Sequence, residues 1–231
     1  MNKLNIISLV LLTLILGSCE LDNYQAPNAQ LTGVIIDAGT NKPIQQDLFS
    51  GSVIDFVEQG FENPQTQSMR FHVDGTYANL TMFAGKYSIQ AVRGNFQTTD
   101  KEEISISGKT VHNFTTLPYL RIIDPKIVKS TDGTKIVATF KIDNVVGSNI
   151  KEIGLFADFT SSVGSTLANN GQTKQAIGNK GNITTVYTLE LKIANMQKVV
   201  NLGNEYYFRI GALADVAESK YNYETAVKIA I

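Results

Sequence analysis

Cys19 is the only cysteine of the chain, and the residues before it would place its thiol at a new amino terminus. Lys3 precedes an apolar run over residues 4–16, and small residues follow just before the cysteine. A run of about 13 residues is too short to span a bilayer as a helix, so residues 1–18 are predicted to be a cleaved signal peptide. The free thiol can then carry a diacylglycerol group. We predict lipid attachment at Cys19; an ordinary signal peptide with a leftover thiol and an uncleaved anchor are the alternatives.

A second set of candidates consists of aromatic and amide side chains that could contact a sugar. Tyr207 points away from Tyr206 by strand alternation, and Tyr221, Asn222 and Tyr223 fall in a predicted loop before the last strand. Aromatic faces stack on sugar rings and amides bind hydroxyls, so Tyr207 and residues 221–223 form our candidate ligand-binding set. The alternative is that these tyrosines pack on the surface or at a domain junction.

Residues that could support catalysis or metal binding are sparse. His72 and Asp74 alternate onto one strand face, but a metal would need at least one further ligand from another strand. Glu102, Glu103 and Asp143 are available as paired carboxylates, yet such acids are usually solvated residues at strand ends. No nucleophile elbow or phosphate-binding loop occurs. We therefore predict a protein that is not an enzyme and has neither a cofactor nor a metal.

Composition limits the partners and favours β-structure. Removal of Lys3 with the leader leaves 19 basic against 21 acidic residues, and no basic patch stands out, so nucleic acid is not an expected partner. The chain is 43% hydrophobic, which is adequate for a core. Val, Ile, Thr, Tyr and Phe recur in short alternating runs without a sustained helical period. These patterns predict an all-β protein.

The first predicted domain follows a polar tether, residues 19–30. Residues 31–118 contain short alternating runs separated by turns such as Asp74-Gly75 and Ser107-Gly108. The predicted strands are 31–37, 53–57, 68–73, 76–81, 86–92, 102–106 and 111–115. The pattern resembles the transthyretin-like, carboxypeptidase-regulatory-like β-sandwich. That resemblance implies that Tyr77 and Tyr87 pack between the sheets.

A second domain is predicted over residues 119–231. Pro118 and Pro125 bracket a strand that suits a sheet edge or a domain junction. Further strands are predicted at 136–142, 150–159, 183–191, 205–213 and 225–231. The segment around Tyr206 resembles the tyrosine corner of fibronectin type III and immunoglobulin-like sandwiches. Residues 161–182 lack large apolar groups and are predicted to be a long loop, either a floppy insertion or a contact for a ligand or partner.

Several segments in order resemble a family of Bacteroidetes lipoproteins known as domain-of-unknown-function 3823. The segments are 18–28, 31–37, 74–77, 85–87 and 117–120. Members of that family are encoded near TonB-dependent outer-membrane receptors and their glycan-capturing lipoproteins, which implies a role in polysaccharide uptake. The resemblance carries no catalytic residues. Asn95-Phe96 departs from a Gly-Pro-Phe expected in relatives.

Two functional hypotheses follow from these observations. The first is a non-catalytic lipoprotein, anchored in the outer membrane and facing the cell surface, that binds an oligo- or polysaccharide or assists a TonB-dependent receptor and its partner lipoprotein. The second is a structural or adhesive surface subunit, such as a pilus-like or assembly protein, that acts by strand-edge pairing. The apolar terminal segment 227–231 leaves this second hypothesis open, because an unpaired terminal strand could complete a partner's sheet.

Overall fold

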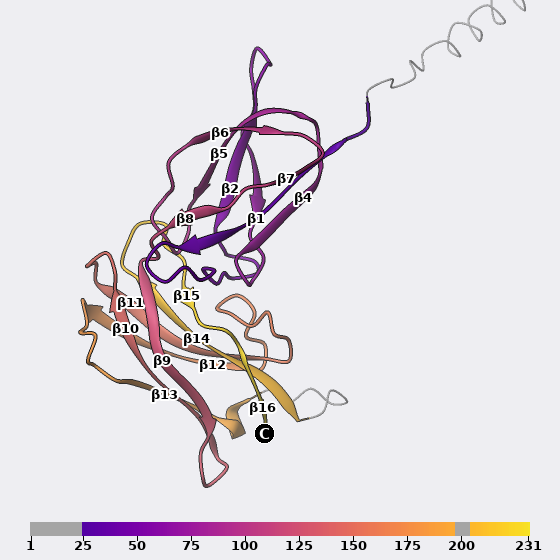
Figure 1. Ribbon diagram of the computed structural model, residues 1–231. Helices are drawn as coiled ribbons and strands as arrows, with labels where there is room; N and C mark the ends of the chain where they lie inside the picture. The colour runs from indigo at the N-terminus through magenta and orange to yellow at the C-terminus, as the bar shows by residue number, and fades with distance from the viewer. Residues whose placement is uncertain (1–24, 197–203) are drawn as a thin grey trace, which may run out of the picture.

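The computed structural model describes residues 25–196 and 204–231, and all of its sheets belong to two β-sandwiches (Figure 1). Strands β1–β8 form the N-terminal domain and β9–β16 form the C-terminal domain. The prediction of an all-β protein with two sandwich domains is confirmed. The predicted signal peptide, Cys19 and the predicted tether up to residue 24 lie outside the described residues.

The N-terminal sandwich consists of two four-stranded sheets. One sheet has the order β4-β1-β7, with β8 also paired to β1, and the other has the order β3-β2-β5-β6. The strands are β1 (Ala29–Asp37), β2 (Val53–Glu58), β3 (Gln67–Arg70), β4 (Thr76–Met82), β5 (Gly85–Val92), β6 (Glu102–Ile106), β7 (Lys109–Val111) and β8 (Phe114–Thr116).

Aromatic rings fill the space between these two sheets. Tyr77 and Tyr87 are buried there, as the family resemblance implied. Phe71 makes edge-to-face contacts with Tyr77, Phe96 and Phe114, at centroid distances of 5.5, 6.1 and 6.4 Å. The alternation of buried and partly buried residues along parts of β1 and β2 places apolar residues on one side of each sheet.

The C-terminal sandwich packs a three-stranded sheet, β13-β10-β9, against a five-stranded sheet, β12-β11-β14-β15, in which β16 also pairs with β14. The core includes Tyr206, Phe208, Ile210 and Ala212, the alternate residues of β14 that the sequence placed on one face. The strands are β9 (Leu120–Lys129), β10 (Lys135–Asn144), β11 (Ile150–Asp158), β12 (Gly171–Asn179), β13 (Tyr187–Lys192), β14 (Glu205–Ala214), β15 (Asn222–Tyr223) and β16 (Val227–Ala230).

Strand β9 contains a proline and lies at a sheet edge, as its sequence suggested. The pairing of β9 with β10 shifts register between Thr139 and Lys141, so Asp124 and Pro125 form a bulge. Asp124 adopts a positive φ of 50° at this point. A bulge at an edge accommodates a proline because the missing N–H interrupts no regular ladder.

Three predicted boundaries are corrected by the structure. Residues 161–182 are not a single loop, because residues 171–179 form the edge strand β12, which pairs with β11. Backbone hydrogen bonds can hold a polar edge strand, so the lack of apolar side chains was misleading. The tether is shorter than predicted, because Ala29 and Gln30 already pair in β1. The strand predicted at 111–115 is two short strands, β7 and β8.

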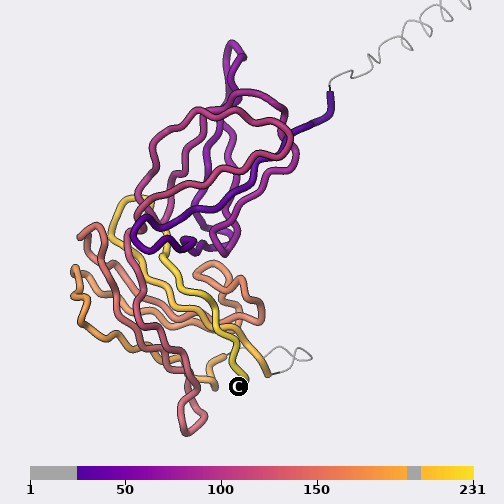
Figure 2. Tube along the Cα trace, in the orientation of Figure 1, coloured from indigo at the N-terminus to yellow at the C-terminus, as the bar shows by residue number. Residues whose placement is uncertain are grey.

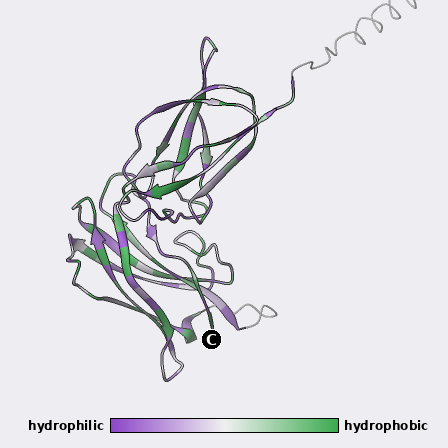
Figure 3. Ribbon diagram, viewed as in Figure 1, coloured by the Kyte–Doolittle hydropathy of each residue, from purple (hydrophilic) through white to green (hydrophobic). Residues whose placement is uncertain are grey.

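The connection between β14 and β16 joins the two domains in space. Figure 2 shows this C-terminal segment rising toward the N-terminal domain before it returns as β16. Lys220 N–H donates to Gly94 O at 3.2 Å, and this hydrogen bond holds the connection against the N-terminal domain. Hydrophobic residues are concentrated along the strands of both sandwiches (Figure 3), whereas several groups that join the domains are polar.

Candidate binding groove between the two domains

Arg209, on β14, is the central residue of the contact between the domains. Its side chain is 0% exposed, although an arginine is rarely buried without partners. All of its donors meet acceptors: Nη1 donates to Gln46 O (2.9 Å) and Val163 O (3.1 Å), Nη2 to Gln45 Oε1 (3.2 Å) and Val73 O (3.4 Å), and Nε to Glu224 O (2.7 Å). The guanidinium therefore binds backbone and side-chain groups of both domains at once.

Arg209 remains a cation in this buried position. Burial lowers its pKa to about 10, opposed by the nearby Tyr223 and Asp47, and this value is still well above neutral pH. The guanidinium carbon also lies 4.4 Å from the centroid of the Tyr223 ring, in cation–π contact. A positive charge at this depth is tolerable because each N–H is paired.

Asp47, from the N-terminal domain, makes a second bridge to the C-terminal domain. Its carboxylate accepts hydrogen bonds from Tyr223 Oη (2.7 Å), from Ser165 Oγ (3.1 Å) and from Thr166 Oγ1. Burial alone would raise the pKa of Asp47, but the bonds from Thr166 and Tyr223 outweigh burial, and the pKa is lowered. Part of the predicted long loop is therefore a structural contact between the domains.

Asn95 makes the third bridge, through atoms of a fully buried amide. Asn95 Nδ2 donates to Gln45 O (2.8 Å) and to Tyr221 O (2.9 Å), and Asn95 O accepts from Asn222 Nδ2 (2.7 Å). Asn222 Oδ1 in turn accepts from Leu120 N–H at 3.1 Å. The residue that departs from the expected Gly-Pro-Phe thus holds both domains together.

An ion triad of Arg121, Asp37 and Asp143 also links the two domains. Arg121 binds Asp37 through Nε (2.6 Å) and Nη2 (2.8 Å), and binds Asp143 through Nη1 (2.9 Å). The hydrogen bonds from Arg121 overcome burial and lower the pKa of Asp37. A Cβ on Gly39 would lie 2.3 Å from Arg121 Nη2, so the triad needs glycine at this position. Asp143, weighed above as a catalytic acid, is thus paired with a cation.

The structure bears out the alternative for residues 221–223, that they pack at the domain junction, and not the hypothesis that they contact a sugar. Tyr221, Asn222 and Tyr223 are buried, because this segment packs under the N-terminal domain and pairs its polar ends there. The two rings stack on each other, and Tyr221 Oη donates to Glu152. These three residues belong to the domain contact and offer no open face to a sugar.

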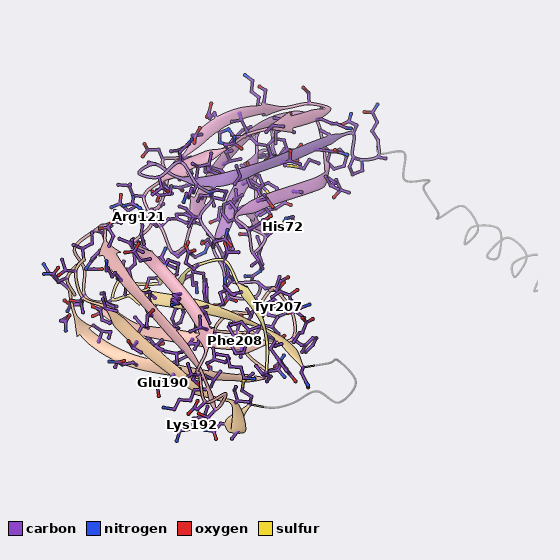
Figure 4. All side chains as sticks on the ribbon, turned by 60° about the horizontal axis from the view of Figure 1, so that its bottom comes forward. His72, Arg121, Glu190, Lys192, Tyr207 and Phe208 are labelled. Carbon is purple, nitrogen blue, oxygen red and sulfur yellow. The ribbon has the colours of Figure 1, made fainter. Side chains whose placement is uncertain are left out.

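Tyr207 is placed differently from the other three candidates. It is half-buried and packs against the small cluster formed by Phe156, Val163, Tyr221 and Tyr223. Lys228 Nζ lies 6.0 Å from the centroid of its ring. Figure 4 shows Tyr207 below His72, on the C-terminal side of the space between the domains. Tyr207 is therefore the one predicted tyrosine that keeps partial access to solvent.

A groove of about 650 Å³ lies between the domains, beside Arg209. The N-terminal domain supplies apolar, amide, cationic, imidazole and carboxylate groups to its walls, and the C-terminal domain supplies hydroxyls, a guanidinium and an alanine side chain. The lining residues are Gln45, Leu48, Arg70, Phe71, His72, Val73, Asp74, Ser161, Ser162, Arg209, Thr225 and Ala226. They come from four separate connections and from strands β3 and β14, so no local sequence pattern identifies the groove as a whole. The sequence had pointed to His72 and Asp74 as possible metal ligands and to residues 161–182, which include Ser161 and Ser162, as a possible ligand contact.

His72 is the imidazole of this groove and is exposed. Its Nδ1 lies 3.0 Å from Thr76 Oγ1, and Thr76 donates in turn to Asp74 Oδ1 at 2.7 Å. These bonds orient the ring, while Nε2 has no protein partner among the described residues. Burial of Asp74 is outweighed by the bonds from Thr76, which keep the pKa of its carboxyl low. The groove thus presents a fixed imidazole beside a carboxylate.

An exposed aromatic residue lies next to a lining residue of the groove in the sequence. Phe49 is 60% exposed and follows Leu48, which lines the groove. Its carbonyl accepts a hydrogen bond from Arg70 Nη1 at 2.7 Å, so the loop and the lining arginine are held together. Phe49 was not among the sequence-based candidates, because an isolated phenylalanine in a turn carries no signal of exposure.

Residues 25–196 and 204–231 contain no group of three or more His, Cys, Asp or Glu side chains placed to hold a metal ion. No helix in the same ranges has the length and apolar character required to cross a bilayer.

The fold and the domain contact define a two-domain β-sandwich protein whose halves are joined by buried polar groups. The chain belongs to the DUF3823 family: residues 29–116 match "Protein of unknown function (DUF3823) N-terminal domain", and residues 120–228 match "Domain of unknown function (DUF3823_C)". The predicted family membership is confirmed. No curated protein matches the chain.

Solved structures show the same architecture. A proposed carbohydrate-binding protein from Bacteroides uniformis is 31% identical, with a TM-score of 0.80, and the match covers 89% of this chain and 100% of that one. A DUF3823 family protein from Parabacteroides merdae is 20% identical, with a TM-score of 0.74 and coverage of 89% and 100%. Another, from Bacteroides ovatus, is 22% identical, with a TM-score of 0.69 and coverage of 88% and 99%.

Proposed function

We propose that this protein is a non-catalytic lipoprotein of the outer cell surface that binds a glycan in the groove between its domains. The observation that carries the proposal is the groove itself, where Arg70, His72, Asp74, Ser161 and Ser162 converge from both domains. Hydroxyls, an imidazole and ionic groups in one depression can satisfy the many hydroxyls of a sugar. Phe49 adds an exposed ring on which a sugar face can stack.

The rigid contact behind the groove supports a binding role. Arg209, Asp47 and Asn95 each bind atoms of both domains, so the two walls of the groove hold a fixed separation. A site that is already formed loses less conformational entropy on binding than a flexible one. The same buried bonds would be needless for two domains that act independently.

Similarity adds a second line of support. The 31% identical protein from Bacteroides uniformis is described as a proposed carbohydrate-binding protein, and it aligns over its full length. Lipid attachment at Cys19 would hold the domains at the membrane, and export to the outer surface would give them access to polysaccharides. In this proposal a TonB-dependent receptor and its partner lipoprotein take up the captured sugar.

A glycan array followed by calorimetric titration tests the proposal. We expect wild-type protein to bind one class of oligosaccharide, and Arg70→Ala, His72→Ala and Phe49→Ala each to weaken that binding about tenfold, the loss of about 1.4 kcal/mol of contact energy. Lys86→Ala is the matched control, because Lys86 is exposed at the far end of the same sandwich and should bind as wild type. The site would be refuted if the wild-type protein bound no glycan, or if all groove variants bound it with the wild-type affinity.

The structure removes the sequence feature that had left a structural subunit open as an alternative. Residues 227–230, which could have completed a partner's sheet, form β16 and pair with β14 of the same chain. The terminal strand is therefore already used within its own domain, and no specific observation favours strand donation to a partner.

A further inference from the structure

Exposed apolar side chains gather at the end of the N-terminal domain that lies away from the groove. Phe61, on the β2–β3 hairpin, is 61% exposed; Leu80 and Phe83, at the end of β4, are 57% and 42% exposed. Isolated apolar residues are common on protein surfaces. Three large ones at one end of a sandwich, one on a strand and two on connections, need an explanation.

The strand registers place these connections at the same end. Gly85, at the start of β5, pairs with Ile106 at the end of β6, and Glu58, at the end of β2, pairs with Tyr87. The β2–β3 hairpin, the β4–β5 turn and the β6–β7 turn therefore lie together. Figure 1 shows the β2–β3 hairpin and the start of β1 at the end of the domain remote from the C-terminal sandwich.

The amino-terminal segment enters the fold at this same end. Asn28 N–H donates to Met82 O at 3.0 Å, and Asn28 Oδ1 accepts from Ala84 N–H at 2.9 Å. Gln30 N–H donates to Gly108 O at 2.7 Å. Asn28 is thus tied to the β4–β5 turn, directly beside the exposed Phe83.

The chain upstream of Asn28 limits how far this end can lie from an anchored Cys19. Asn28 is nine positions after Cys19, and nine residues reach about 30 Å even when fully extended. A lipid on Cys19 would therefore keep the β4–β5 turn within one domain length of the bilayer.

We propose that this end of the N-terminal domain rests on the bilayer, with Leu80, Phe83 and Phe61 inserted among the lipid headgroups. The inference rests on the lipid attachment of the proposed function. It extends that function by giving the molecule an orientation: the apolar end faces the membrane, and the groove at the opposite end of the same sandwich faces outward.

Charge does not drive this contact. The exposed lysines Lys86 and Lys109 at this end are offset by Glu58 and Glu62. Apolar burial, worth about 25 cal/mol per Å² removed from water, must supply the binding energy. The contact should therefore form on zwitterionic lipid and should not require anionic lipid.

Tryptophan fluorescence tests the orientation, because the natural chain contains no tryptophan. We would reconstitute the full lipid-carrying protein in phosphatidylcholine vesicles with brominated acyl chains, as the variants Phe83→Trp and Phe49→Trp. Phe49 is the matched control, being exposed at the groove end of the same domain. We expect blue-shifted emission and several-fold stronger quenching for Phe83→Trp, and no quenching for Phe49→Trp.

The other outcomes separate the two proposals. Protein that floats with the vesicles while Phe83→Trp is unquenched would overturn the membrane contact and leave the lipid anchor in place. Equal quenching at both positions would overturn the orientation. Protein that does not float with vesicles would overturn the anchor and the membrane contact together. Each variant should unfold near the wild-type melting temperature, which shows that its tryptophan reports on a natively folded protein.

Discussion

The two ends of the N-terminal domain are built from opposite kinds of surface. The end that meets the C-terminal domain buries charged and amide groups, among them Asp37, Asp47 and Asn95, and pairs them across the boundary. The end where the amino-terminal segment enters exposes apolar groups such as Leu80 and Phe83. Apolar burial is non-directional, whereas paired polar groups tolerate one geometry only. The first end is suited to fixing a partner's position and the second to resting on a fluid surface.

Removing Arg209 should weaken the contact between the domains more than any other single change. Arg209→Ala leaves acceptors of both domains buried without donors, and we expect the free energy of unfolding to fall by about 3–5 kcal/mol. Urea unfolding followed by circular dichroism should then show two separated transitions, one for each domain. Arg209→Lys, which keeps the charge but not the planar set of donors, should fall between wild type and Arg209→Ala. A single unchanged transition in Arg209→Ala would refute the central role of the guanidinium.

Asn95→Ala should have the next largest effect. Its amide serves acceptors on Gln45 and Tyr221, so the loss leaves buried carbonyls unpaired and should cost about 1–3 kcal/mol of unfolding free energy. The same chemical denaturation experiment measures this loss. Asn63→Ala is the matched control, since Asn63 is exposed in the β2–β3 hairpin, and it should unfold as wild type. Equal stability of both variants would contradict the bridge.

Acid should weaken the domain contact through its carboxylates. The pKa of Asp47 is lowered from its ordinary value of 3.8, so the unfolded chain takes up the proton first as pH falls. The stabilisation is complete above about pH 5 and is lost as pH drops through the lowered native value. Asp47→Asn should be less stable at neutral pH and should show a shallower loss between about pH 5 and pH 2. In Asp47→Asn part of the pH dependence of stability remains, because the pKa of Asp37 is also lowered. Parallel pH profiles for the variant and the wild type would argue against this role.

Changes at the apolar end should affect stability least. Leu80→Ser and Phe83→Ser remove exposed side chains, so the free energy of unfolding should change by no more than about 0.5 kcal/mol. The double variant with an intact Cys19 should stay on membranes but become more accessible to added protease at residues 80–85. Unchanged protection would indicate that these side chains do not touch the bilayer.

Local patterns predicted most of the strands. β2, β4, β5, β6, β10 and β14 begin and end within two residues of their predicted bounds, because alternation of apolar and polar residues reports a half-buried strand directly. β12 escaped notice, since its polar side chains carry no such pattern and its pairing with β11 uses the backbone. The sequence left open whether Tyr221 and Tyr223 contact a ligand or pack at the domain junction, because the groups that cover them lie more than 100 residues away in the sequence.

The sequence by itself determined the all-β class, the division into two sandwiches, the family and the chemistry available at Cys19, because these depend on residue type and short-range order. Only the tertiary structure decided which polar residues meet across the domain boundary, that residues 221–223 are buried there, and that His72 and Ser161 share one groove. The reason is physical: a strand pattern specifies which side faces a core, but the partner of a buried polar group depends on connections folded from distant parts of the chain.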